Sequence, residues 1–412
     1  MAFEQQYKKF LVRADLVSNN LTTNISDYIT MVAVKKQFVD NSFPLFVISM
    51  MTTNEIRNNI RDNDDAKIHL SVYIYTYSEN SGISEEESNT AYPEELLYDT
   101  TLRIYEKPYS ITRYDIDEDT QEDSSLAPFI PYTISCIPED LIKKNNSVVN
   151  CVYEYTTPMT AAVNILTDNL LSNDMELYLD ANDSKKLNII KSDMLIPPQS
   201  PIAAIKYLDD MYGIYKYGRA ALFLDTSKRI YLYDILNGSR SMNRTFLYNH
   251  VSSTNTSYAS ANVPEYDRDT DTLKYTSSLM PIFIDNRLAE RDAIGTNIHF
   301  YSYDEVFNCL SPESLVYSNI NKKTRFFWNP YCGRSMYEDR FINSVSETRA
   351  IGMSYVGINP EFFAPDTRVS ILSDYETIAG EYFIYEVSYV LSTTDRKEYT
   401  SETSLALQKI IK

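Results

Sequence analysis

The chain has 412 residues, of which 43% are hydrophobic, 13% aromatic and 23% charged. This much apolar mass excludes a wholly disordered chain, and the low counts of 9 glycines and 16 prolines exclude a collagen-like fibre. The formal net charge of −19 disfavours a nucleic-acid binder, because such proteins gain most of their affinity by neutralising phosphates. The longest apolar runs are too short for a membrane helix, so we expect a folded chain of two or three domains without a transmembrane segment.

The first hundred residues have the alternating pattern of antiparallel β-strands. Over residues 67–77, one face carries Ile68, Leu70, Val72 and Ile74, and the other carries His69, Ser71, Tyr73, Tyr75 and Tyr77. Residues 46–51 and 101–107 are further strand candidates. The acidic stretches 80–95 and 115–123 are predicted to be solvated loops, as charge runs usually are.

The middle of the chain changes to a helical period. Thr157 as N-cap and Pro158 as first helical residue predict a helix, whose apolar stripe is Ala161, Ala162, Ile165, Leu166 and Leu170. Ser200 and Pro201 predict a second helix that ends at Gly213, with a stripe of Ile202, Ile205, Leu208 and either Met211 or Tyr212. Two short strands at 220–225 and 229–234 follow, joined by a tight turn at 226–228.

After residue 245 the pattern returns to β-strands. The candidates are residues 279–284, 297–303, 369–372, 381–391 and 400–411, and in 381–391 we expect Phe383, Tyr385, Val387, Tyr389 and Leu391 to share one face. The predicted fold is mainly β with a central α/β segment. The predicted domains are a first β domain at 1–125, a middle α/β domain at 126–245 and a second β domain at 246–412.

The search for reactive groups finds no catalytic, cofactor-binding or metal-binding residue to nominate. The three histidines are His69, His250 and His299, and a structural role is expected for those within strand patterns. The sequence has no nucleophile elbow, phosphate-binding loop or dinucleotide fingerprint. The aspartates at 115, 117 and 119, and those at 267, 269 and 271, begin like calcium loops but lack the turn glycine and the bidentate glutamate.

The cysteines and the single tryptophan also favour structural roles. Cys136, Cys151, Cys309 and Cys332 are scattered without a Cys-x-x-Cys pair, so we expect reduced and mostly buried thiols. Trp328 is expected to be a core or interface anchor rather than a platform for a sugar. Paired carboxylates for glycoside hydrolysis would be possible among 57 acidic residues, but no motif supports them.

One segment resembles a known family. It reads Met194-Leu-Ile-Pro-Pro-Gln-Ser-Pro-Ile-Ala-Ala-Ile-Lys-Tyr-Leu-Asp-Asp-Met-Tyr-Gly-Ile-Tyr-Lys-Tyr-Gly-Arg-Ala-Ala-Leu-Phe-Leu-Asp225, and Arg229-Ile-Tyr-Leu-Tyr233 completes it. This order of Pro-Pro, short helix, tyrosine-containing turn, apolar strand ending in aspartate, turn and Tyr-Leu resembles the middle domain of the central baseplate hub proteins of long-tailed bacteriophages. The flanking β regions lie in matching places.

The resemblance implies a structural virion protein and not an enzyme. Hubs of this family are homotrimers in which each chain supplies two superposable tail-tube-like β-barrels, so that a pseudo-six-fold ring joins the tail tube to a three-fold spike or tip. The implied partners are further copies of the chain, the tail-tube protein, the spike or tip protein and the tape-measure protein, with transient contact to passing DNA and no stable nucleic-acid binding. The implied location is the virion tail or baseplate, after assembly in the host cytoplasm.

Two aspects of this interpretation have alternatives. The negative charge would keep DNA sliding if it lines a channel, or it simply keeps a large assembly soluble. The rival functions are another tail β protein, such as a distal ring or receptor-binding component, and a glycan-active tail enzyme. The Tyr-rich outer face at Tyr73, Tyr75 and Tyr77 is expected to contribute to an interface, since tyrosine combines a large apolar ring with a polar tip.

Overall fold

The protein is represented by a computed structural model. It describes residues 4–5, 7–19, 21–39, 41–77, 95–106, 129–172, 174–180, 187–215, 220–234, 243–251, 264–278, 282–284, 296–301, 313–316, 323–328, 350–376, 378–393 and 398–409. The predicted acidic loops at 80–95 and 115–123, apart from Glu95, lie outside these residues, as do Cys309 and Cys332.

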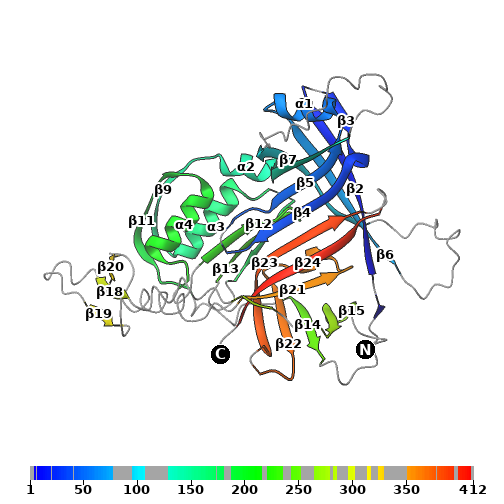
Figure 1. Ribbon diagram of the computed structural model, residues 1–412. Helices are drawn as coiled ribbons and strands as arrows, with labels where there is room; N and C mark the ends of the chain where they lie inside the picture. The colour runs from blue at the N-terminus through cyan, green and yellow to red at the C-terminus, as the bar shows by residue number, and fades with distance from the viewer. Residues whose placement is uncertain are drawn as a thin grey trace, which may run out of the picture.

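Most of the described strands belong to one large sheet (Figure 1). The sheet has 16 described strands, and the order of its main path is β1 (Glu4–Gln5), β15 (Pro264–Asp267), β16 (Thr272–Ser277), β14 (Arg244–His250), β22 (Thr367–Leu372), β23 (Gly380–Ser392), β4 (Ile29–Gln37), β5 (Leu45–Thr52), β8 (Ile130–Pro138), β7 (Glu95–Glu106), β6 (Lys67–Tyr77), β2 (Tyr7–Ser18) and β3 (Leu21–Asn24). Off this path, β21 (Ala350–Val356) pairs with β17 (Ile282–Ile284) and with β24 (Thr400–Lys409), which also pairs with β23.

This sheet unites the beginning and the end of the chain. Strand β23 pairs with β4 along seven residue pairs, from Glu386↔Gln37 to Ser392↔Met31. An isolated bridge also pairs Phe10 of β2 with Tyr399, just before β24. The pairing is antiparallel except at β14, which runs parallel to both β16 and β22. The domain boundaries stay a prediction. Strand β8, which falls within the predicted middle domain, pairs with β5 and β7 of the predicted first domain.

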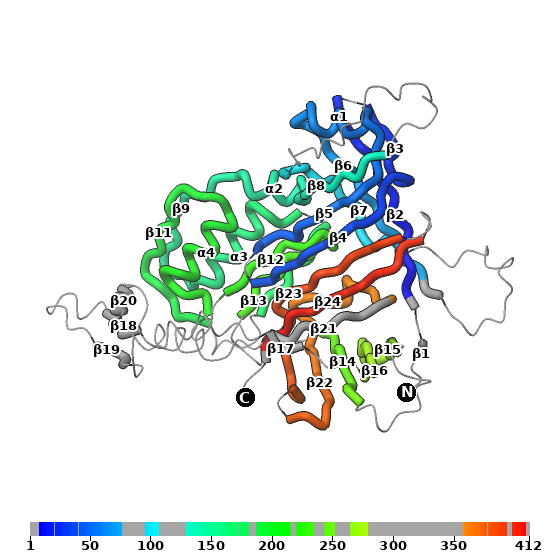
Figure 2. The backbone as a smooth tube through the Cα atoms, viewed as in Figure 1, coloured from blue at the N-terminus to red at the C-terminus, as the bar shows by residue number. Residues whose placement is uncertain are grey.

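The middle of the chain forms layers on one side of this sheet. Helices α3 (Pro158–Asn169) and α4 (Pro201–Tyr212) pack together between two small sheets, as the tube drawing shows (Figure 2). One small sheet pairs β9 (Val149–Thr156) with β11 (Lys191–Gln199), and the other has the order β10 (Glu176–Leu179), β13 (Arg229–Asp234), β12 (Ala220–Leu224). The remaining described elements are α1 (Asn54–Asp62), α2 (Glu139–Asn145), η1 (Ser26–Tyr28), η4 (Pro360–Phe362), β18 (Thr296–Tyr301), β19 (Glu313–Val316) and β20 (Lys323–Trp328).

The mainly β fold with a central α/β segment is confirmed, and so are both predicted helices. Thr157 caps α3 by accepting a hydrogen bond from the Thr160 amide at 3.1 Å. Gly213 ends α4 with a φ of 69°, a conformation that suits glycine. Both predicted stripes are buried, with Tyr212 rather than Met211 completing the second one. No helix among the described residues is long and apolar enough to cross a membrane.

The strand predictions hold except in β23. The buried face of β6 is the predicted one, although β7 begins at Glu95, six residues before its predicted start. In β23 the expectation that Phe383 and Tyr385 share a face with Val387 is wrong. The pairing with β24 shifts register between Ile384 and Glu386, and such a bulge inserts one residue and exchanges the faces. Tyr382 and Ile384 therefore precede Val387 in the core.

The described residues form two hydrophobic cores that share one wall, the β12–β13 hairpin. Alternate residues of the hairpin belong to different cores because successive side chains of a strand point to opposite faces. The core of the large sheet takes Ala221, Phe223, Tyr231 and Tyr233, and the core of the middle layers takes Leu222, Leu224, Ile230 and Leu232. The predicted hairpin at 220–234 is thus confirmed, and both of its faces are buried.

Candidate functional site: a buried ionic junction at the shared hairpin

The hairpin is attached to the large sheet by hydrogen bonds as well as by packing. The Tyr233 hydroxyl donates to the Phe38 carbonyl at 2.8 Å, and the Leu224 amide donates to the Ser42 carbonyl at 2.9 Å. The rings of Phe38 and Phe223 meet edge to face with centroids 4.8 Å apart. These contacts hold the hairpin against the segment between β4 and β5.

A buried lysine joins the hairpin to two other segments. Lys36 of β4 has a side-chain exposure of 1%, and its ammonium donates to both carboxylate oxygens of Asp225, at 2.9 and 3.1 Å. The same ammonium donates to Glu361 of η4 at 2.5 Å. Asp225 and Glu361 are only 4% and 11% exposed. We call Lys36, Asp225 and Glu361 the ionic junction. Along the chain, Asp225 lies 189 residues and Glu361 lies 325 residues from Lys36.

The junction contains one ammonium group and two carboxyl groups, and this excess of acidic groups shifts the pKa values of Lys36 and Glu361. Burial alone would lower the pKa of Lys36, but Asp225 and Glu361 more than offset this effect and raise it, so the lysine stays charged. Burial raises the pKa of Glu361, Lys36 counteracts that rise and Asp225 adds to it, with a net upward shift. The Tyr389 hydroxyl donates to Glu361 at 3.0 Å. Glu361 therefore takes up a proton at a higher pH than an ordinary glutamate does.

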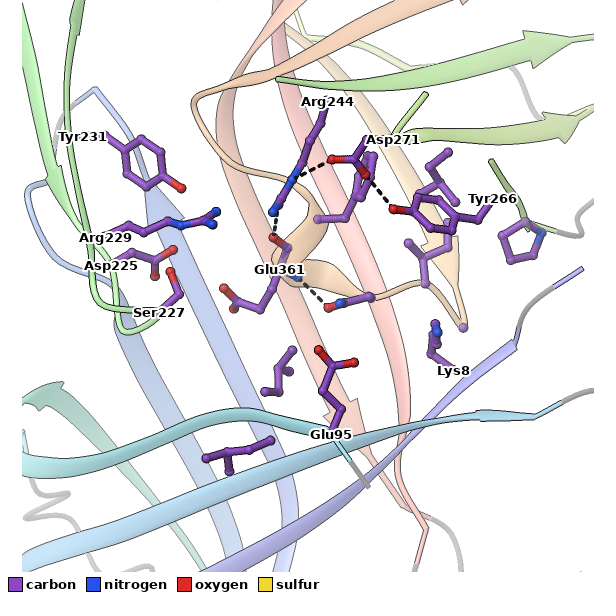
Figure 3. Close-up of a pocket in the computed structure, with 18 residues that line it drawn as sticks. Lys8, Glu95, Asp225, Ser227, Arg229, Tyr231, Arg244, Tyr266, Asp271 and Glu361 are labelled. Carbon is purple, nitrogen blue, oxygen red and sulfur yellow. Dashed lines mark hydrogen bonds and ion pairs between the residues drawn. The ribbon is translucent and has the colours of Figure 1, made fainter. Parts of the chain in front are cut away.

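A cavity of about 440 Å³ lies against the junction, where segments from all three predicted domains meet (Figure 3). Asp225, Arg229 and Tyr231 approach it from the hairpin, Glu361 from η4, and Lys8 and Glu95 from strands β2 and β7. The lining thus mixes both signs of charge, and most of these groups engage one another or a neighbouring side chain. Arg229, for example, pairs with Glu176 at 3.1 Å.

Arg244 connects two segments on the far wall of the cavity, through contacts with Glu361 and Asp271. Its guanidinium donates to the Glu361 carbonyl at 3.2 Å and pairs with Asp271 at 3.4 Å. Asp271 also accepts from the Tyr266 hydroxyl at 2.7 Å, and burial together with this bond raises the pKa of Tyr266 to about 12. The arrangement offers charge pairing across the segments that line the cavity.

The histidines and cysteines weighed in the sequence lie apart from this junction, whereas Asp271 lines the cavity beside it. His69 faces Asp99 on the accessible side of β6, at 3.2 Å, and His250 is buried with its ring nitrogen 3.2 Å from the Ser373 hydroxyl. Asp267 and Asp271 stabilise the turn between β15 and β16 instead of gathering round an ion. Cys136 is buried and Cys151 half-buried, both free thiols. Within the described ranges, no three His, Cys, Asp or Glu side chains are arranged to hold a metal ion.

Sequence reasoning missed the ionic junction, although one signal was present. Lys36 continues the series Val32, Val34 at the spacing of two that marks the buried face of β4, and Phe38 follows it in the same phase. A lysine in such a series is almost never fully buried without a partner. The partners themselves could not be identified, because Asp225 and Glu361 are remote in sequence and only the fold brings them together.

The fold of the chain is similar to that of a tail protein of known structure. The tail protein from Neisseria meningitidis MC58 shares it, with a TM-score of 0.52 and 11% sequence identity over 97% of this chain and 96% of that one. The 43 kDa tail protein of prophage MuSo2 from Shewanella oneidensis aligns over 95% of this chain and 96% of its own, with a TM-score of 0.49 and 8% identity. No curated protein matches the sequence.

The chain belongs to the Bacteriophage PBS1 gene 109 protein family, whose model matches residues 8–410. Family and fold together confirm the predicted resemblance to bacteriophage tail proteins.

Proposed function

We propose that the chain is the tail hub, a homotrimeric virion protein that joins the six-fold tail tube to a three-fold spike or tip. The observation that carries this proposal is the strand order of the large sheet. The pairing of β23 with β4, together with the Phe10–Tyr399 bridge, joins the two terminal β regions edge to edge in one sheet. This edge-to-edge arrangement supports the proposal, because neighbouring β units of a ring must protect their strand edges against uncontrolled pairing.

The proposal assigns the remaining parts of the chain to the same assembly. Residues 1–125 and 246–412 supply the two ring positions of each protomer, and the ionic junction fixes the middle domain against both. The partners are two further copies, the tail-tube protein, the spike or tip protein and the tape-measure protein. The acidic chain touches passing DNA only transiently, in a tail or baseplate assembled in the host cytoplasm.

Imaging of the purified oligomer tests the symmetry. A hub gives particles of three times the 47.6 kDa chain mass, with three-fold symmetry and two superposable β units alternating round a central channel. Six-fold particles would instead identify a distal ring, and a monomer with two β units of unrelated topology would refute the hub. A monomer with superposable units is then mixed with purified tail-tube protein, and failure to form a three-fold complex on it also refutes the hub.

We also propose that the chain is not an enzyme. Its family and fold relate it to tail proteins, and the charged groups that line the cavity at the junction include ion pairs such as Arg244 with Asp271. Purified protein incubated with host peptidoglycan and wall polysaccharide should release no soluble fragments. Reproducible cleavage that is abolished by a substitution in the chain would establish the rival glycan-active function.

A further inference from the structure

The outer face of the β9–β11 sheet exposes many apolar side chains. Val152 and Leu195 stand directly opposite each other, and the pair Lys191↔Thr156 marks the end of the sheet next to Tyr155, Ile189 and Ile190. These five apolar side chains are between 54% and 78% exposed. The opposite face of the sheet, with Met194 and Ile196, is buried against the helices. Concentrated apolar exposure of this kind marks an interaction site more often than a bare surface.

The backbone at the same place is also unusual. Tyr155 has a φ of 47°, in the left-handed region that few residues other than glycine adopt. A bulky aromatic residue in this conformation costs free energy, and such outliers gather where a residue serves a binding role. Here the conformation accompanies a ring that is 78% exposed.

Two carboxylates lie within this apolar surface. Glu154 and Asp193 are directly opposite each other and share a face with Val152 and Leu195, two residues away on each strand. Like charges in this position repel, and neither carboxylate has an ion pair or side-chain hydrogen bond within the described part of the chain. Lys191, which has contacts of its own, is the basic residue of these two strands on that face. An added cation between the two carboxylates would remove the repulsion.

We propose that a second protein binds the outer face of this sheet, at Val152, Glu154, Asp193 and Leu195, and the exposed apolar end beside it, at Tyr155, Ile189 and Ile190. It binds through an extended segment that presents a lysine or arginine between apolar side chains. Apolar contacts with Val152 and Leu195 supply the buried area, and the basic residue neutralises Glu154 and Asp193. A second copy that presents this same face fits less well, because it would place its own Glu154 and Asp193 against the same two carboxylates. The inference is independent of the proposed hub function.

Binding of two matched synthetic peptides to the full chain tests the proposal. One fluorescent peptide alternates leucine with lysine, its twin alternates leucine with glutamate, and anisotropy is measured at low and at physiological salt. We expect the lysine peptide to bind and its twin to show no binding. The double variant Glu154→Gln/Asp193→Asn should weaken binding about fivefold and reduce its salt dependence. The double variant Val152→Ser/Leu195→Ser should weaken binding at least as much but leave the salt dependence of binding unchanged.

Two controls keep the result specific. Asp64→Asn/Asp65→Asn removes two exposed acids beside α1, and Leu372→Ser removes an apolar side chain that is 50% exposed elsewhere. Neither control variant should change the affinity for the lysine peptide. Equal losses in the control and test variants, or equal binding of both peptides, would overturn the proposal. So would sedimentation analysis in which Val152→Ser/Leu195→Ser dissociates an oligomer of the chain, because the face would then join copies.

Discussion

The two cores of the molecule differ in how far along the chain their residues lie. The middle core takes all its buried residues from Leu141 to Leu232, whereas the sheet core extends from Phe10 to Leu407. The middle core is therefore built from local patterns, and the sheet core depends on distant pairings such as β23 with β4. The shared hairpin, with one face in each core, is therefore the element that connects the local middle core to the large sheet.

The largest effect is expected from removing the cation of the ionic junction. Lys36→Met leaves Asp225 and Glu361 buried together without a counter-charge, which typically costs about 3–5 kcal/mol of unfolding free energy. Denaturant unfolding measures the loss. The matched control is Lys35→Met on the same strand, because Lys35 is 46% exposed and its pair with Glu386 is worth at most about 1 kcal/mol. Equal losses in the two variants would show that the junction does not hold the cores together.

Truncation within the local core ranks next. Leu208 is fully buried in α4, so Leu208→Ala should lower the unfolding free energy by about 2–5 kcal/mol. Met211→Ala on the same helix is the control, because Met211 is only partly buried and should cost less. Thermal unfolding distinguishes them. An unchanged transition in Leu208→Ala would mean that α4 does not pack as described.

The contrast between the cores also explains what the sequence could predict. Helices α3 and α4 and the β12–β13 hairpin follow from caps, stripes and a turn within a few residues of one another. The bulge in β23 could not be foreseen, because an inserted residue shows itself only through the pairing with β24. For the ionic junction, the only signal in the sequence was Lys36, which stands at a buried position in the alternation of β4. Its partners and the single large sheet depend on contacts that local patterns do not record.

The protonation of Glu361 should give the junction a pH dependence. Its pKa is raised, so the folded protein holds this proton at a higher pH than the unfolded chain does. The stability that Glu361 contributes is therefore present below its ordinary pKa of 4.5 and is lost as pH rises through the folded value. Because Glu361→Gln cannot ionise, its stability relative to the native chain should improve from pH 4.5 upward in denaturant titrations. A relative stability that falls over this range would contradict the assigned direction.

The smallest expected effect is a difference in stability between variants at the starts of α3 and α4, which look alike in the sequence. Thr157 caps α3 with its side chain, whereas the Ser200 side chain makes no capping bond to α4. Thr157→Ala should therefore cost about 1 kcal/mol, and Ser200→Ala much less. Calorimetry of the two variants measures the difference. Equal losses would show that the Ser200 hydroxyl caps its helix in solution.

Hydrogen exchange in a hairpin variant tests most directly whether the two cores are joined through their shared wall. Phe223 belongs only to the sheet core, so Phe223→Ala removes no side chain from the middle core. If the hairpin couples the cores into one cooperative unit, the slowest amides of α4 and of β5 should both exchange faster by the same factor. Faster exchange in β5 with unchanged exchange in α4 would contradict this account, because the cores would then open independently.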